Sequence, residues 1–232
     1  MIDGSDTTKV NRKEQLAEVS VFLFLILPSM ALSFFAIKPG GLSFPFVAVS
    51  TILRDLALVS LILFFIWRNH EPATWIGWTL KNSGKEISIG ILLFIPFTFG
   101  TGLLEKGLQA IGLSAPSTPL PSFLAARGMV EFLLALVLVV IVALAEETIF
   151  RGYLILRFRA ITSNPLAAAF LSAVIFSLGH GYEGSAGVVT VGVMGLVFAF
   201  VYMWRQSLVA PMAMHFLQDF FGIVLLPLLR KG

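Results

Sequence analysis

The sequence predicts an all-α, polytopic integral membrane protein built as a bundle of about seven transmembrane helices. Hydrophobic residues make up 57% of the 232-residue chain and charged residues only 12%, against about 45–50% and about 25% in soluble domains. A water-soluble fold of this composition would expose large apolar patches. The apolar residues also gather into runs of about 20, the length of a spanning helix, and lack the alternation of a membrane barrel. Composition therefore excludes a disordered chain and an ordinary cytosolic enzyme.

Seven apolar runs, in chain order, predict the transmembrane helices. They cover residues 17–37, 44–67, 87–104, 129–150, 165–180, 185–204 and 207–229. Residues 1–16 are polar and no clear cleavage site follows them, so we expect the first helix to be retained. The chain is thus divided into a polar N-terminus (1–16), N-terminal transmembrane helices and loops (17–128), and a C-terminal core (129–229).

The connectors between these runs carry turn and cap signals. Residues 38–41 read Lys-Pro-Gly-Gly and predict a turn, and residues 113–122 contain three prolines and predict a loop. Residues 68–85 form a polar loop. Ser163-Asn164-Pro165 predicts a helix start, with a capping side chain followed by proline at the first helical position. Gly195 and Ala199 form a small-x-x-x-small pair, which favours close approach of a neighbouring helix.

The distribution of Lys and Arg predicts the orientation in the membrane. With the N-terminus in the cytosol, inside segments hold ten basic residues and outside segments five, the asymmetry expected of cytoplasmic loops. These charges form no basic stripe, so nucleic acid is not a predicted partner; the predicted partner at this point is the lipid bilayer. The chain contains no cysteine, which excludes disulfides, thiolate metal sites and a cysteine nucleophile.

Ionisable residues within apolar runs are costly and therefore mark candidate functional sites. Glu146 and Glu147 end a long apolar run, and Arg151 follows. Glu147 and Arg151 are four residues apart and share a helix face, while Glu146 is turned about 100° away. We expect Arg151 to neutralise Glu147 and leave Glu146 facing something else.

Two of the three histidines also lie in predicted transmembrane helices. His180 closes the run that contains Phe176, and His215 lies four residues before Asp219 in the last run, so that this pair shares a helix face. Arg54 and Asp55 lie within the second run. Because adjacent residues do not face each other on a helix, we expect them to have separate partners on other helices, or to mark a break, and a structural role.

This set of side chains suits hydrolysis by an activated water. A carboxylate in an apolar pocket can act as a general base, a histidine beside it can hold the same water, and polar groups can stabilise an oxyanion. Two histidines and a glutamate are also the ligand types of a catalytic zinc site, here Glu146, His180 and His215. The His-Glu-x-x-His signature of zinc proteases is absent, and spacing leaves both mechanisms open.

The three motifs together resemble those of a known family. Glu146-Glu147-x-x-x-Arg151, Phe176-x-x-x-His180 and His215-x-x-x-Asp219 are similar, in this order, to the motifs of the CPBP intramembrane proteases, the type II CAAX prenyl protease or Abi family. The resemblance covers residues 129–222 and points to the bacterial branch, and so to a prokaryotic plasma membrane.

The resemblance implies a four-helix catalytic core and a role for each motif residue. Glu146 would activate water with His180, and Glu147 with Arg151 would support the site. His215 and Asp219 would stabilise the oxyanion. The implied activity is an endopeptidase that cleaves a membrane-associated or C-terminal, CAAX-like peptide, by the glutamate mechanism or with zinc. The implied partner is therefore a peptide or membrane-protein substrate. The alternatives are a catalytically idle immunity or scaffold protein and a proton-coupled transporter.

Overall fold

The computed structural model describes residues 12–35, 42–115 and 124–229, and these residues form helices without any strand. Their order is α1 (Arg12–Ser33), α2 (Phe44–Arg68), η2 (Ala73–Ile76), α3 (Ser83–Ala110), α4 (Gly128–Glu146), η4 (Glu147–Leu154), α5 (Ile155–Thr162), α6 (Pro165–Leu178), η5 (Gly181–Glu183), α7 (Gly184–Arg205), α8 (Val209–Asp219), η6 (Phe220–Leu225) and α9 (Leu226–Leu229). The predicted all-helical membrane bundle is confirmed.

Six of the seven predicted runs are helices long and apolar enough to cross a membrane. One of them is the continuous rod formed by α4, η4 and α5, residues Gly128–Thr162. The remaining run is α6, an apolar helix of only 14 residues. The predicted turn at 38–41 and the prolines at 116, 119 and 121 lie outside the described residues.

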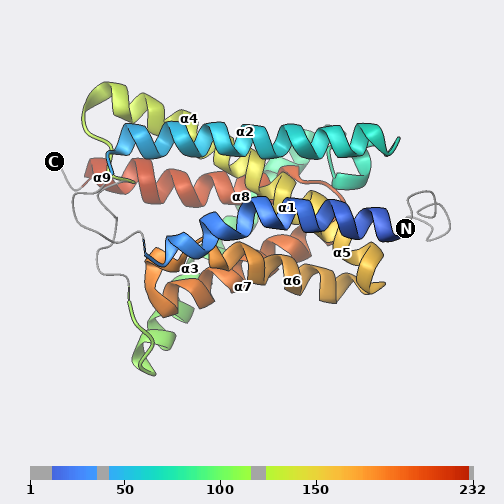
Figure 1. The fold of residues 1–232 in the computed structure, drawn as a ribbon. Helices are drawn as coiled ribbons and strands as arrows, with labels where there is room; N and C mark the ends of the chain where they lie inside the picture. Colours follow the sequence, from blue (N-terminus) through green and yellow to red (C-terminus); the bar gives the residue numbers. More distant parts are fainter. Residues whose placement is uncertain (1–11, 36–41, 116–123, 230–232) are drawn as a thin grey trace.

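The long helices lie side by side along one axis, with the rod of α4, η4 and α5 crossing the middle of the bundle (Figure 1). Helix α2 packs on α4, α3 on α8, and α6 on both α5 and α7. Helix α1 begins at one end of the bundle and α9 ends at the other (Figure 1).

The start of α6 follows the predicted capping pattern. The Asn164 side chain accepts hydrogen bonds from the backbone N–H groups of Leu166 at 2.9 Å and Ala167 at 3.1 Å. Pro165 occupies the first helical position, where its missing N–H costs nothing. Ser163 ends α5 in the left-handed region, at φ 56°. The hairpin between α5 and α6 is therefore encoded locally.

Buried ion pairs fix the helices at the end of the bundle where α1 begins. Arg157, only 1% exposed, donates to both carboxylate oxygens of Glu71 at 2.7 and 2.6 Å and lies 3.3 Å from Glu18 Oε2. Arg157 is one of the ten basic residues of the predicted inside segments. Its guanidinium is not a solvated loop charge, because it pairs with two carboxylates inside the protein.

Gly90 allows α3 to lie against α8. A Cβ at this position would come within 2.6 Å of the Ala210 carbonyl oxygen and 2.8 Å of Ala213 Cβ. We expect Gly90→Ala to lower the free energy of unfolding by about 1–3 kcal/mol, the usual cost of overpacking, and to lower the melting temperature of the protein in detergent. Gly100→Ala in the same helix is the control, since its Cβ would meet nothing within 4 Å. Equal melting temperatures for the two variants would contradict the prediction.

Candidate active site

The glutamate motif lies where the central rod changes its helical geometry. Glu146 is the last residue of α4, and Glu147 begins η4, a π-helical segment of eight residues. Short π-helical segments occur mostly inside α-helices and often at functional sites. All eight residues of this segment are buried. This π-helical segment thus lies in the protein interior, at the position of the predicted site.

Glu147 and Arg151 form an ion pair that is sealed from solvent. Arg151 Nη1 donates to Glu147 Oε1 at 2.8 Å, and the two side chains are 1% and 0% exposed. The guanidinium also stacks on the ring of Phe176, with Cζ 4.3 Å from the centroid, and its Nη2 lies 3.5 Å from the Gly195 carbonyl oxygen. Close approach at Gly195 was predicted, and a Cβ there would lie 3.2 Å from Ala173 Cβ.

His215 makes the contact that sequence reasoning missed. Its Nδ1 lies 2.7 Å from Glu147 Oε1, the oxygen that also accepts from Arg151. Because an ionised carboxylate only accepts, Nδ1 is the donor. The other ring nitrogen, Nε2, lies 3.8 Å from Glu146 Oε2 and 3.6 Å from Asp219 Oδ2. Glu147 therefore orients the His215 ring so that Nε2 is directed between the other two carboxylates.

His180 is held by its own helix end. Its Nδ1 lies 3.2 Å from the Phe176 carbonyl oxygen, and a carbonyl oxygen accepts but never donates. Nδ1 therefore carries a proton, and in the neutral ring Nε2 remains an acceptor. The Phe176 ring contacts both histidines, with centroids 5.0 Å from His180 and 6.1 Å from His215. No hydrogen bond or ion pair joins His180 to Glu146 within the described segments.

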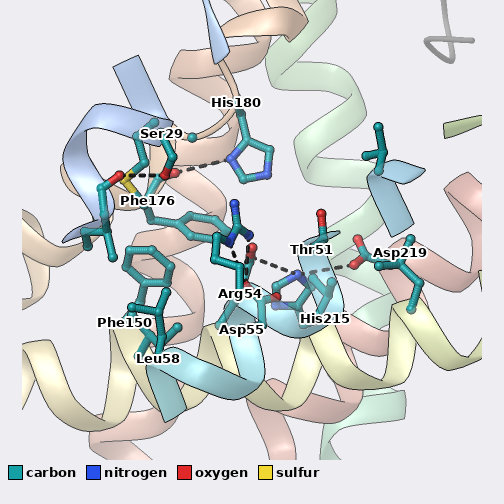
Figure 2. Close-up of a pocket in the computed structure, with 18 of the residues that line it drawn as sticks. Ser29, Thr51, Arg54, Asp55, Leu58, Phe150, Phe176, His180, His215 and Asp219 are labelled. Carbon is teal, nitrogen blue, oxygen red and sulfur yellow. Dashed lines mark hydrogen bonds and ion pairs between the residues drawn. The ribbon is translucent and has the colours of Figure 1, made fainter. Parts of the chain in front are cut away.

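One cavity brings these side chains together. Glu146, His180, His215 and Asp219 all line a cavity of about 210 Å³. Figure 2 shows His180 on one side of this cavity and His215 with Asp219 on another. Glu147 is not a lining residue and lies behind His215. The side chains predicted to act chemically thus face a common space, and the buried ion pair lies outside it.

Arg54 and Asp55 line the same cavity, contrary to the expectation of separate partners or a helix break. Helix α2 is continuous from Phe44 to Arg68. The Arg54 side chain bends back, so that Nε and Nη2 donate to Asp55 Oδ1 at 3.0 and 2.9 Å. The rule that neighbours do not face each other fails here because the arginine side chain is long enough to reach around the helix. Their mid-helix position was the sequence signal for this contribution to the site.

The zinc alternative assigned Glu146, His180 and His215 as ligands. Among residues 12–35, 42–115 and 124–229, no group of three or more His, Cys, Asp or Glu side chains is arranged so that it could hold a metal ion. His215 Nδ1 is already bonded to Glu147, and His180 contacts neither of the other two proposed ligands by hydrogen bond or ion pair. The donor set does not fit a zinc site in this conformation.

The C-terminal helices are similar to a known protein family. Residues 128–221 match the family of type II CAAX prenyl endopeptidases described as Rce1-like. The chain is 29% identical over 126 residues to the uncharacterized protein YyaK of Bacillus subtilis (strain 168), and the match covers 53% of this chain and 40% of the Bacillus protein. No solved structure matches the chain. The matched segment contains Glu146, Arg151, His180 and His215, and this segment is similar to the Rce1-like type II CAAX prenyl endopeptidases.

Proposed function

We propose that this protein is an intramembrane endopeptidase in which Glu146 and His180 activate a water molecule and His215 with Asp219 stabilises the oxyanion. The observation that carries the proposal is the position of these four side chains around one cavity inside a membrane bundle. The match of residues 128–221 to a family of CAAX prenyl endopeptidases supports the same reaction class.

Water activation follows from the free acceptors of Glu146 and His180. Within the described residues the Glu146 carboxylate makes no hydrogen bond, and its one charged contact is with His215 Nε2 at 3.8 Å. A water molecule between the two residues donates one hydrogen bond to Glu146 and the other to His180 Nε2. Its oxygen then attacks the peptide carbonyl carbon. Glu146 takes the proton and passes it to the leaving amine as the C–N bond breaks.

His215 is placed to meet the negative charge that develops on the carbonyl oxygen. When it carries both ring protons, Nδ1–H is used by Glu147 and Nε2–H can donate to the oxyanion. Asp219 Oδ2 lies 3.6 Å from Nε2 and helps to hold the ring. A protonated Asp219 carboxyl is itself a donor. Glu147 and Arg151 orient His215 and do not touch the substrate.

The proposed substrate is a membrane-associated or C-terminal, CAAX-like peptide, on the strength of the family description. The site lies among helices that could cross a membrane, so a substrate carried in the bilayer can reach it without leaving the lipid. We further propose a prokaryotic plasma membrane as the location, with a cytosolic N-terminus, from the excess of Lys and Arg in the inside segments.

Cleavage of a peptide library by the purified full-length protein tests the activity, and metal removal tests the mechanism. We expect the wild type to cleave at a rate that is unchanged after complete chelation, with metal content measured by elemental analysis. Loss of cleavage on chelation, with recovery on adding zinc, would contradict the glutamate mechanism. A wild type that cleaves no peptide would favour an idle immunity or scaffold protein, and proton-coupled uptake by liposomes would favour a transporter.

A further inference from the structure

The Arg54–Asp55 pair is a charged feature of the cavity that the proposed reaction does not use. Arg54 lies ten residues after Phe44 and fourteen before Arg68, about 15 Å and 21 Å along the helix axis. This depth is remote from lipid headgroups at either end of α2. An arginine near the middle of a membrane helix is costly and favours a functional role.

The hydrogen bonds of the pair leave part of the guanidinium free. Nε and Nη2 of Arg54 both donate to one oxygen, Asp55 Oδ1. Nη1 has no hydrogen-bond partner within the described residues, and the Arg54 side chain is 47% exposed whereas Asp55 is 1% exposed. Asp55 thus anchors one edge of the guanidinium, and Arg54 reaches from α2 into the cavity with other donors unused (Figure 2).

The charge of the cavity makes Arg54 the place where an anion would bind. The lining includes three acids, Asp55, Glu146 and Asp219, and Arg54 is the single Lys or Arg among the described lining residues. A negatively charged group entering elsewhere would be repelled by the carboxylates. At Arg54 it would meet N–H donors in the planar geometry that suits a carboxylate.

A short peptide end fits this space. The cavity volume of about 210 Å³ is below the roughly 300–1,000 Å³ typical of small-molecule pockets, so it holds only the very end of a peptide chain. A chain end of that length brings its terminal carboxylate into the same cavity as the scissile bond. We propose that Arg54, anchored by Asp55, binds the free C-terminal carboxylate of the peptide substrate and selects chain ends over internal segments; this rests on the proposed endopeptidase function.

Two libraries of short peptides that differ only in their C-terminus, free carboxylate against carboxamide, test the proposal on the full-length protein. We expect the wild type to cleave the acid library with a kcat/KM about 10- to 100-fold higher, the usual effect of a charged hydrogen bond. In Arg54→Gln, kcat/KM for the acid library should fall by the same factor through KM, with the amide library unchanged. Arg54→Lys, which keeps the charge but loses the planar fork, should show an intermediate preference.

Arg205→Gln is the matched control, because Arg205 pairs with Glu86 at 2.6 Å and does not line the cavity. It should leave the preference for the acid library unchanged. The proposal is overturned if the wild type shows no preference, or if Arg54→Gln slows cleavage of both libraries equally, which would indicate that Arg54 only neutralises the nearby carboxylates. If Arg54→Gln does not fold, the acid-to-amide ratio of Arg54→Lys decides.

Binding separates this proposal from the proposed function. Thermal stabilisation of the Glu146→Gln protein by each library needs no hydrolysis, since a ligand that binds the folded state raises its melting temperature. We expect the acid library to stabilise this protein more than the amide library, and adding Arg54→Gln to abolish the difference. That result would support a carboxylate site even if the wild type cleaves neither library; equal stabilisation by the two libraries would refute the site.

Discussion

Replacing Glu146 with Gln is expected to lower the rate of peptide hydrolysis by about 10²–10⁴-fold, the contribution of a positioned general base. Glutamine keeps the shape of the side chain and much of its hydrogen-bonding capacity, but it cannot take a proton from water. Within the described residues Glu146 makes no hydrogen bond, and its charged contact with His215 Nε2 is long, at 3.8 Å. The measurement is kcat/KM on a cleaved library peptide.

Folding of this variant should be close to that of the wild type. Its helical content and melting temperature in detergent serve as controls, because little in the structure depends on the Glu146 charge. Full activity in Glu146→Gln would remove the proposed role of this carboxylate in either mechanism, and an idle membrane protein would then be the leading interpretation.

Replacing Glu147 with Gln should have a different outcome, loss of stability together with loss of activity. The substitution leaves Arg151 charged and buried without its carboxylate partner, and it weakens the bond that orients His215. Breaking a buried ion pair by removing one partner typically costs about 3–5 kcal/mol. We expect a markedly lower melting temperature and lower yield of membrane-inserted protein.

A double variant separates the two consequences. In Glu147→Gln with Arg151→Met, no uncompensated charge remains, and apolar replacement of buried pairs is often neutral for stability. Thermal stability should therefore recover in part, while hydrolysis stays low because His215 lacks the Glu147 carboxylate. Recovery of both stability and activity would show that the orientation of His215 by this carboxylate is dispensable.

Hydropathy and local spacing predicted much of this structure. The apolar runs predicted the membrane helices, and the four-residue spacing of Glu147 and Arg151 predicted a bond that forms within one helix. The Asn164 cap is also a local feature. These predictions succeeded because each depends on residues that lie close together in the chain.

Contacts between distant segments could not be predicted in this way. The bond from His215 to Glu147 joins residues 68 positions apart, and the burial of Arg157 depends on Glu71, 86 positions away. The π-helical geometry of η4 changes the direction of side chains that a regular helical period assumes. For Arg54, the helical period correctly indicates that adjacent residues point in different directions. It takes no account of the length of the arginine side chain, which reaches back to Asp55.

The short length of α6 has a consequence for the wall of the cavity. Fourteen residues extend about 21 Å, less than the roughly 30 Å of a hydrocarbon core. The chain therefore leaves its helix at Gly179 and His180 before it can reach the far side of the bilayer. Non-helical backbone is tolerated at such depth only where it is enclosed by protein or faces water, and Gly179, His180 and Tyr182 line the cavity. Here the backbone is enclosed by protein, since the N–H groups of Gly179 and His180 donate to the carbonyl oxygens of Phe176 and Ser177, and the N–H of Gly181 donates to Ser33 Oγ. The early end of α6 therefore places a polar wall of the cavity within the bundle and leaves none of these three N–H groups unpaired.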